Sequence, residues 1–332
     1  MIKNGILLTG AAARISQEVA VLDLLFADGL KISQDESFLV GYSSGAMNLL
    51  ALNGCFRKEN PLDWNTYYKE KILFQLKDSD VFEIFPRTGK SLLNTAPFRP
   101  FLGGILNDMG FNSFGALPFR SYVLTSQVQD LATYWANNQK PGHGQLDPTD
   151  LFMASTSIPV VLPSQEVKNT DGSVNRDFPM GEFIDGGTWG AFKNYANELG
   201  DFIKKNGPME ELHVISPMRE TLEELESTKN HLIKKHSIIK TAKIDLTNFK
   251  KHFKIGLQEF LTFLSSLNTL NAKKDISQEI FVSLPAMKKN TGILSFGKQK
   301  ETYDTVHDWL SGEGKDQLKV PIADFLRQNG KD

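Results

Sequence analysis

Two short motifs hold the residues of this chain that are best suited to chemistry. The first is Gly41-Tyr42-Ser43-Ser44-Gly45, a G-x-S-x-G sequence between the apolar run 38–40 and a helix-like run over 46–52. A strand–turn–helix connection of this kind lifts one serine hydroxyl off the end of a sheet, which makes Ser43 the candidate nucleophile. The second is Asp185-Gly186-Gly187, which places a carboxylate on a glycine turn after an apolar pair. A nucleophile and a base are the minimum for acyl transfer through a covalent intermediate.

Each motif also has an ordinary structural interpretation. Glycine turns that pack a helix on a sheet often match G-x-S-x-G, and Asp-Gly is common turn chemistry. Ser44 is a competing nucleophile, but it lies one place beyond the reactive position of the motif. No histidine lies beside either motif in the sequence. The Asp185 carboxylate would therefore take the proton directly, within about 3 Å of Ser43 in a partly desolvated site.

A third segment, Thr9-Gly10-Ala11-Ala12-Ala13-Arg14, links a predicted strand over 2–9 to a predicted helix. Its backbone N–H groups would converge on an oxyanion, with Arg14 adding positive charge nearby. The alternatives are a plain strand-to-helix loop or a phosphate-binding turn. A dinucleotide site is not favoured, because the G-x-G-x-x-G pattern and its later acidic partner are both missing.

The order of elements predicts an α/β fold. The strand–helix–strand opening, with strands over 2–9 and 38–40, favours a parallel sheet with crossover helices. Further strands are expected over 121–127, 131–135, 183–184, 212–216 and 280–284. Asp147 and Pro148 are typical of a helix start, and that helix should end before Pro159. Helices are expected over 248–270, 301–310 and 320–328, and residues 55–119 should form helices and loops that cover one side of the site.

The composition is that of an ordinary globular protein, with 332 residues, 40% hydrophobic and 23% charged. A formal net charge of −2 gives no reason to expect nucleic acid as a partner. The single cysteine, Cys55, excludes an intramolecular disulfide and fits a reducing compartment. No convincing signal peptide or membrane-spanning run is found, so a cytoplasmic location is expected, with peripheral membrane contact as an option. The six histidines lack metal-ligand spacing, so neither a metal nor a cofactor is expected.

Four segments, taken together and in order, resemble the bacterial patatin-like phospholipases. They are residues 9–22, the elbow 41–45, the run Ala154 to Pro159 followed by Leu162-Pro163, and 185–187. The resemblance covers about residues 1–220. It implies a three-layer α/β/α fold with a mainly parallel sheet, a catalytic core over 1–220, and a mostly helical extension over 221–332 that packs on it as one structural domain.

The resemblance also implies a catalytic dyad rather than a triad. Ser43 would be the nucleophile and Asp185 its base. The supporting residues would be the oxyanion loop and the turn glycines: Gly10, Ala11, Ala12, Ala13, Arg14, Gly41, Gly45, Gly186 and Gly187. The expected activity is hydrolysis of a lipid ester, as in a phospholipase A or lysophospholipase, through an acyl-enzyme. The alternatives are a serine acyltransferase, an esterase with a histidine base, or a weakly active or inactive scaffold that binds a membrane or a protein.

One departure from the family pattern concerns the first loop. Relatives usually have three consecutive glycines where this chain has Gly10-Ala11-Ala12, and Ile15 stands where a further glycine is expected. Two added methyl groups would narrow the oxyanion pocket, or force other dihedral angles if the loop needs positive φ. The two dyad residues are present, so we favour an active hydrolase.

A lysine-rich run lies in the C-terminal part. Residues 229–254 hold eight lysines against one acid, Asp245, with apolar residues between them. Such a run would rest on an anionic membrane, each lysine near the surface contributing about 1 kcal/mol. The alternative is a helix with its lysines in water and its apolar face on the core. Nucleic-acid binding fits less well, because no known module is recognisable.

Overall fold

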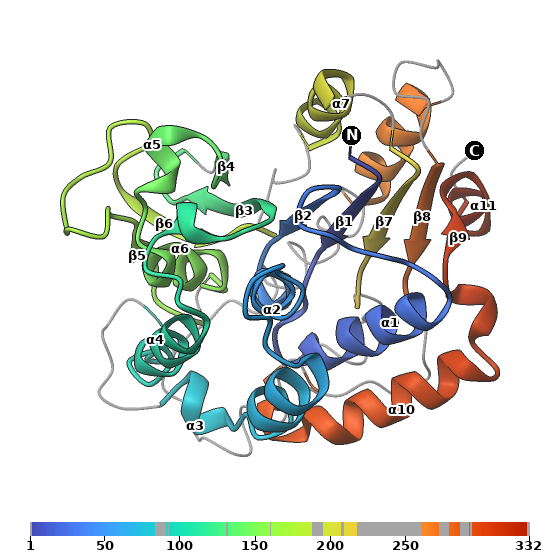
Figure 1. The fold of residues 1–332 in the computed structure, drawn as a ribbon, viewed down its shortest axis with the longest axis horizontal. Helices are drawn as coiled ribbons and strands as arrows, with labels where there is room; N and C mark the ends of the chain where they lie inside the picture. The colour runs from blue at the N-terminus through green and yellow to red at the C-terminus, as the bar shows by residue number, and fades with distance from the viewer. Residues whose placement is uncertain are drawn as a thin grey trace.

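The structure, a computed structural model, describes residues 2–83, 91, 93–130, 132–159, 161–187, 195–206, 209–217, 260–271, 279–285, 292 and 294–330. Its centre is a mixed sheet with helices on both faces (Figure 1). The strands among the described residues are β1 (Asn4–Leu8), β2 (Ser37–Gly41), β3 (Arg120–Gln127), β4 (Thr133–Asn137), β5 (Gln165–Glu166), β6 (Glu182–Asp185), β7 (Glu211–Ile215), β8 (Glu279–Ser283) and β9 (Val320–Pro321).

The middle of the sheet is parallel. Its order is β5-β6-β3-β2-β1-β7-β8-β9, with β4 paired to β3 off this path. The strands β3, β2, β1, β7 and β8 run parallel, and β4, β5, β6 and β9 join by antiparallel pairing. β1 lies between two parallel neighbours, which explains why it is a continuous apolar run buried on both faces.

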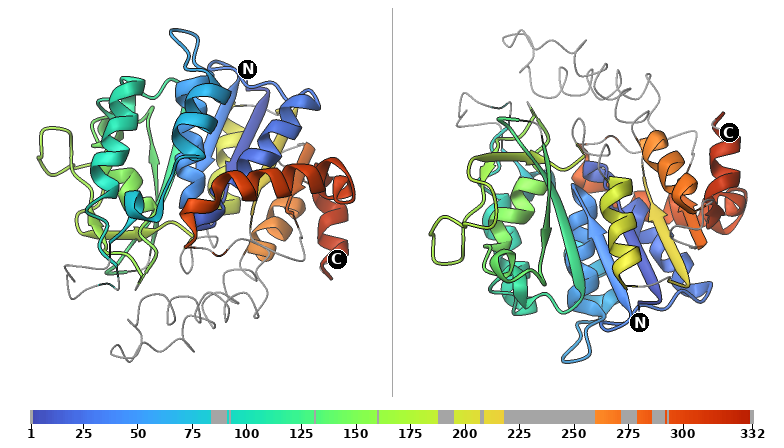
Figure 2. Two further views of the ribbon diagram at one scale, coloured as in Figure 1. Left: turned by 90° about the horizontal axis from the view of Figure 1, so that it is seen from below. Right: turned by 90° about the horizontal axis from the view of Figure 1, so that it is seen from above.

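The helices form two layers, one on each face of the sheet (Figure 2). Ile6 and Leu8 of β1 belong to the core under α1, α2 and α10, whereas Leu7 belongs to the core under α7, α11 and residues 260–271. This three-layer arrangement confirms the predicted α/β/α fold. The helices are η1 (Ala12–Arg14), α1 (Ile15–Ala27), α2 (Ser44–Cys55), η2 (Trp64–Leu73), α3 (Asp78–Val81), α4 (Phe98–Met109), η3 (Phe114–Ala116), α5 (Pro141–Gly144), α6 (Pro148–Ser155), α7 (Tyr195–Asn206), η5 (Phe296–Lys298), α10 (Gln299–Ser311), η6 (Lys315–Gln317) and α11 (Ile322–Gln328).

The cap predicted for α6 is present. The Asp147 carboxylate accepts hydrogen bonds from the N–H groups of Thr149 (2.7 Å) and Asp150 (3.2 Å), and Pro148 occupies the first turn. The helix ends at Ser155, before Pro159, as expected. This cap matters for the site because the last residue of α6 and a residue just after it contact the two dyad candidates.

The C-terminal part adds strands as well as helices. β8 extends the parallel sheet beside β7, and β9 pairs with β8. Residues 260–271 are helical, which agrees with the end of the helix expected over 248–270. Its earlier residues, and the lysine-rich run from Lys229 to Lys254, lie outside the described residues. None of the helices in the described ranges combines the length and the apolar character needed to cross a bilayer.

Candidate active site

Ser43 occupies a sharp turn between β2 and α2. Its backbone has φ of +53° and ψ of −139°, a conformation that a residue with a side chain rarely adopts. Such strain costs on the order of 1–3 kcal/mol and persists only where the surroundings enforce it. Here the Ser43 N–H donates to the Ser155 carbonyl at 2.9 Å, and the Ser43 carbonyl accepts from Ala46 at 3.0 Å. Ser43 as a whole residue is 7% exposed.

The two glycines of the G-x-S-x-G motif are needed for close packing. A Cβ at Gly41 would lie 2.8 Å from the Gly45 carbonyl oxygen, and one at Gly45 would lie 2.4 Å from the Leu8 carbonyl oxygen. Neither neighbour is a flexible side chain, so neither can move aside cheaply. The glycines therefore let the turn fold tightly against the end of β1.

Strand register explains how Asp185 reaches Ser43. Gly41, the last residue of β2, pairs with Val123 of β3, and Asp185, the last residue of β6, pairs with Thr125. Asp185 thus lies two residues further along β3 than Gly41, and Ser43 lies two residues beyond Gly41 in the chain. β6 is antiparallel to β3, so it begins beyond the carboxyl end of β2, runs back toward it, and ends level with the turn from β2 into α2.

The end of α6 and the residues that follow it contact both Ser43 and Asp185. The Ser155 carbonyl accepts from the Ser43 N–H, and the Ser157 carbonyl accepts from the Asp185 N–H at 2.9 Å. The Ser155 hydroxyl donates to the Leu124 carbonyl of β3 at 2.7 Å, which ties this segment to the sheet. The sequence resemblance pointed to this run, but its bridging hydrogen bonds have no signature in residue spacing.

The structure brings Ser43 and Asp185 into hydrogen-bond contact. The Ser43 hydroxyl donates to the Asp185 carboxylate, and the Gly187 N–H donates to Oδ1 of the same carboxylate at 2.7 Å. Burial raises the pKa of Asp185 to about 6, and these two hydrogen bonds lower it in part. The group is therefore ionised near neutral pH, but it is a stronger base than an exposed aspartate.

Gly186 and Gly187 lie where side chains would collide. A Cβ at Gly186 would be 2.2 Å from the Leu124 carbonyl oxygen. One at Gly187 would be 2.7 Å from the ring of Tyr42. The Asp-Gly-Gly turn is thus packed between β3 and the residue that precedes Ser43.

The first loop lies against the elbow. A Cβ at Gly10, which has φ of +63°, would meet the Gly45 nitrogen at 2.5 Å. The Gly10 N–H donates to Glu18 at 2.7 Å, the Ala11 N–H donates to Ser44 Oγ at 2.9 Å, and the Arg14 N–H donates to the Ala11 carbonyl at 3.0 Å.

Ala12 has φ of +51° and lines the same cavity as Ser43. Within the described part of the chain its N–H has no acceptor, and Ala12 is the one residue of 10–14 that lines this cavity, so the oxyanion donor expected from this loop narrows to Ala12.

Arg14 does not reach the cavity beside Ser43. The residue is 1% exposed, and it is absent from the described residues that line that cavity. The side chain of Gln299, from α10, donates instead to the carbonyl of Ala13 at 2.9 Å. The loop is thus supported from the C-terminal part of the chain, 286 residues away.

A buried polar network behind the loop was missed in the sequence. Glu18 accepts from the Gly10 N–H and from the side-chain amide of Asn48 (2.7 Å), and Asn48 accepts from the Tyr68 hydroxyl (2.6 Å). Burial raises the pKa of Glu18 to about 7, and its hydrogen bonds oppose the shift. Glu18, Leu22 and Leu25 lie in one row of α1. The presence of an acid in this otherwise apolar row is the signal that could have revealed the network.

An apolar cavity opens beside Ser43. It contains about 820 Å³ of space free of atoms, part of which is open to solvent. The segment 55–119 supplies much of its wall through η2, α3 and α4, as expected from the sequence, and Leu294 and Phe296 come from the C-terminal part. The lining residues are Ala12, Ile15, Ser43, Ser44, Met47, Leu50, Ala51, Tyr68, Ile72, Leu73, Leu76, Val81, Phe82, Phe98, Phe101, Ile105, Met109, Thr156, Ile158, Leu162, Leu294 and Phe296.

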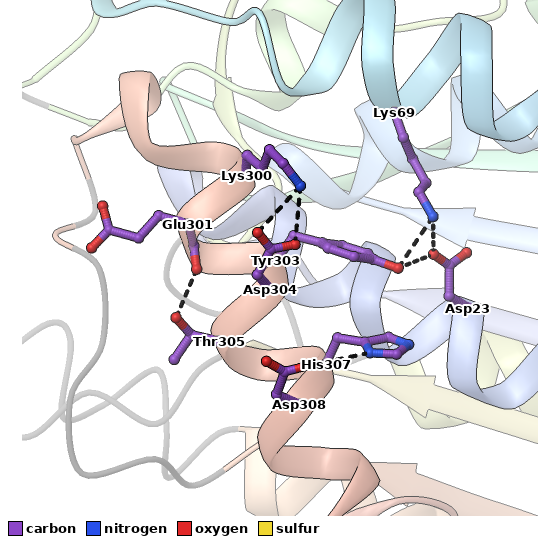
Figure 3. Close-up of polar contacts among 9 residues, drawn as sticks. All are labelled: Asp23, Lys69, Lys300, Glu301, Tyr303, Asp304, Thr305, His307 and Asp308. Carbon is purple, nitrogen blue, oxygen red and sulfur yellow. Dashed lines mark hydrogen bonds and ion pairs between the residues drawn. The ribbon is translucent and has the colours of Figure 1, made fainter.

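A cluster of polar side chains holds η2, one of the helices that line the cavity, against α1 and α10 (Figure 3). Asp23 of α1 accepts from Lys69 of η2 at 2.5 Å and from the Tyr303 hydroxyl of α10 at 2.5 Å, and Lys69 Nζ lies 3.1 Å from the same hydroxyl. Trp64 of η2 adds a hydrogen bond to Asp23 at 2.6 Å. The side chains of Lys69 and Asp23 are only 13% and 14% exposed, so solvent screens this pair little.

The histidines within the described ranges have partners elsewhere. His143 accepts from the Asn137 N–H and lies 2.9 Å from the Asp177 carbonyl, and His213 pairs with Glu211 at 2.8 Å. His307 stacks on Tyr303 of α10. In the same ranges, no group of three or more histidine, cysteine or carboxylate side chains is arranged to hold a metal ion.

Comparisons with known proteins agree with the resemblance seen in the sequence. A family model described as patatin-like phospholipase matches residues 6–189, more than half of the chain. A search of curated proteins finds no match. Among solved structures, the crystal structure of VipD from Legionella pneumophila is similar with 10% identity and a TM-score of 0.34, over 92% of this chain and 67% of that chain.

Proposed function

This chain belongs to the patatin-like phospholipase family, and from that premise we propose that it is a lipid acyl hydrolase with a Ser43–Asp185 dyad. One observation carries the proposal: the Ser43 hydroxyl donates to a buried Asp185 carboxylate at the wall of an apolar cavity. Catalytic nucleophiles are activated by a base within hydrogen-bond reach, and the raised pKa of Asp185 suits that role.

The reaction would proceed in two halves. Asp185 takes the proton as Ser43 Oγ attacks the ester carbonyl, which gives a tetrahedral intermediate. Collapse of this intermediate breaks the ester bond, Asp185 returns the proton to the leaving alcohol, and an acyl-enzyme remains. Water, deprotonated by Asp185, then releases the fatty acid and restores Ser43.

The oxyanion would be held by backbone N–H groups. The Ala12 N–H and the Ser44 N–H at the first turn of α2 have no acceptor among the described residues, and both residues line the cavity with Ser43. Helix N-termini favour negative charge, which supports Ser44 in this role. Loss of one such donor typically lowers kcat by about 10²–10³.

The cavity supports an acyl chain as the substrate group, because its wall is almost entirely apolar. A phospholipid or lysophospholipid is the first candidate from the family. Contact of the lysine-rich run 229–254 with an anionic membrane is a separate part of the proposal, and its test is binding to vesicles with and without anionic lipid.

The decisive experiment compares wild type, Ser43→Ala and Asp185→Asn on a panel of phospholipid, lysophospholipid and p-nitrophenyl esters. Each variant should lose at least about a thousandfold in kcat. Asp171→Asn, a change at an exposed aspartate in a loop, is the matched control and should keep native turnover. A fluorophosphonate probe should label wild type and Ser44→Ala but not Ser43→Ala. Near-native turnover of Asp185→Asn would mean that another group is the base.

A further inference from the structure

The apolar cavity follows the length of two helices. On α2 the lining residues Met47, Leu50 and Ala51 lie one and two turns beyond Ser43, on the helix face that Ser43 begins. On α4 the lining runs from Phe98 at the first turn to Met109 at the last residue. A molecule attached to Ser43 would therefore extend along α2 toward the far ends of both helices.

Met109 closes that far end. It is the last residue of α4 and 1% exposed. Its side chain packs on the backbone of Gly54, near the end of α2: a Cβ at Gly54 would lie 2.7 Å from Met109 Sδ and 3.0 Å from Cγ. Behind it, the Met109 carbonyl accepts a hydrogen bond from the Arg57 guanidinium at 2.5 Å. Met109 thus lies between the cavity and the charged group of Arg57.

The helix geometry gives the length of the path. Ala51 is eight residues beyond Ser43 and Gly54 is eleven, which correspond to about 12 Å and about 16 Å along α2. Carbon–carbon bonds of about 1.5 Å at tetrahedral angles advance an extended chain by about 1.25 Å per carbon. The path therefore fits about 10 carbons up to Ala51 and about 13 up to Gly54, where Met109 occupies the last part.

We propose that the enzyme prefers medium-chain acyl esters, with an upper limit of about 10–12 carbons set by Met109. This inference rests on the proposed function. Below the limit, each methylene buried should raise kcat/KM about fourfold. Beyond it, kcat/KM should level off or fall, because the apolar path along α2 ends at Met109.

Two substitutions move the limit in opposite directions. Met109→Ala removes the three heavy atoms beyond Cβ, so the limit should shift by about three carbons and kcat/KM for a 14-carbon ester should rise by up to about 50-fold. Gly54→Ala adds a methyl group that pushes the Met109 thioether into the cavity, so the limit should become shorter. Met209→Ala, a buried methionine of the core on the other face of the sheet, is the matched control and should leave the limit in place.

The test is kcat/KM for p-nitrophenyl esters of 4 to 16 carbons, on the full chain, in wild type and the three variants. Thermal unfolding of each variant shows whether it is folded, and Gly54→Ala keeps the test decisive if Met109→Ala is not. Ser43-dependent hydrolysis with the same chain-length limit in wild type, Met109→Ala and Gly54→Ala would overturn this inference and leave the proposed function standing. Absence of any Ser43-dependent hydrolysis would instead overturn the proposed function.

Discussion

Replacement of the Asp185 carboxyl group by an amide should stabilise the folded protein at neutral pH while it removes activity. Burial of the ionised group raises its pKa from 3.8 to about 6. A shift of one pKa unit corresponds to about 1.4 kcal/mol, so holding Asp185 ionised lowers the free energy of unfolding by about 3 kcal/mol. The side chain introduced by Asp185→Asn would keep both hydrogen bonds, because its oxygen can accept from the Gly187 N–H and its nitrogen can donate to Ser43 Oγ.

The pH dependence of this effect has a definite sign. Between pH 3.8 and about 6 the folded protein keeps a proton on Asp185 that the unfolded chain has lost. Stability therefore falls as pH rises through this window, and the loss is complete above about pH 6. The amide has no proton to lose. The advantage of Asp185→Asn over wild type should be near zero at pH 3.5, grow to about pH 6, and stay at about 3 kcal/mol above that.

Urea unfolding of both proteins from pH 3.5 to pH 9 measures this difference directly. Other carboxyl groups, including Glu18, titrate in both proteins and cancel. As a control, Asp201→Asn, at an exposed aspartate of α7, should differ from wild type by less than about 0.5 kcal/mol throughout. A difference that does not change with pH, or an Asp185→Asn protein that is less stable at pH 8, would refute the argument. The same titration should appear in wild-type kcat/KM, which should rise with pH to a plateau above about 6, because only ionised Asp185 accepts the serine proton.

Two further predictions concern groups that act through the loop and the cavity wall. Glu18→Gln replaces one carboxylate oxygen by an NH₂ group, which would face either the Gly10 N–H or the Asn48 side-chain amide. The value of kcat should therefore fall about tenfold, while KM stays within about twofold of wild type. A variant with native kcat would show that the loop does not depend on this carboxylate. Tyr303→Phe removes a hydrogen bond to Asp23, which should lower the free energy of unfolding by about 1–3 kcal/mol and raise KM as η2 loosens. The control is Tyr134→Phe, because the Tyr134 hydroxyl donates to Asp130 at the surface, at 3.2 Å. Equal losses of stability and equal rises in KM in the two variants would contradict the role given to Tyr303.

Much of the fold could be predicted from the sequence because its signals are local. Short apolar runs predicted the strands of the parallel sheet, and Asp147 with Pro148 predicted the start of α6. The contact between Ser43 and Asp185 is different in kind, because it depends on strand register and on the segment after α6. Only the family resemblance related those two residues, and their catalytic roles remain predictions. The polar network around Glu18 had no signal beyond one acid in an apolar row.

The alanines of the first loop illustrate how structure refines such a prediction. Ala11 has a negative φ, −157°, so the methyl group there does not require the left-handed backbone conformation. Ala12 has φ of +51°, in the left-handed region that favours glycine. A side chain in that region costs about 1–2 kcal/mol. The departure from three consecutive glycines therefore has a conformational cost at one position, and that position holds the N–H that we assign to the oxyanion.

The site depends on parts of the chain beyond the family match. That match ends at residue 189, yet Leu294 and Phe296 line the cavity and Gln299 supports the carbonyl of Ala13. A residue with a side chain disfavours positive φ, so a loop that contains one keeps its conformation only through contacts with its surroundings. Here the support comes from α10, which also fastens η2 through Tyr303. The C-terminal part thus supports both the loop that holds the proposed oxyanion donor and the cavity wall, so we infer that residues after 189 belong to the proposed catalytic unit.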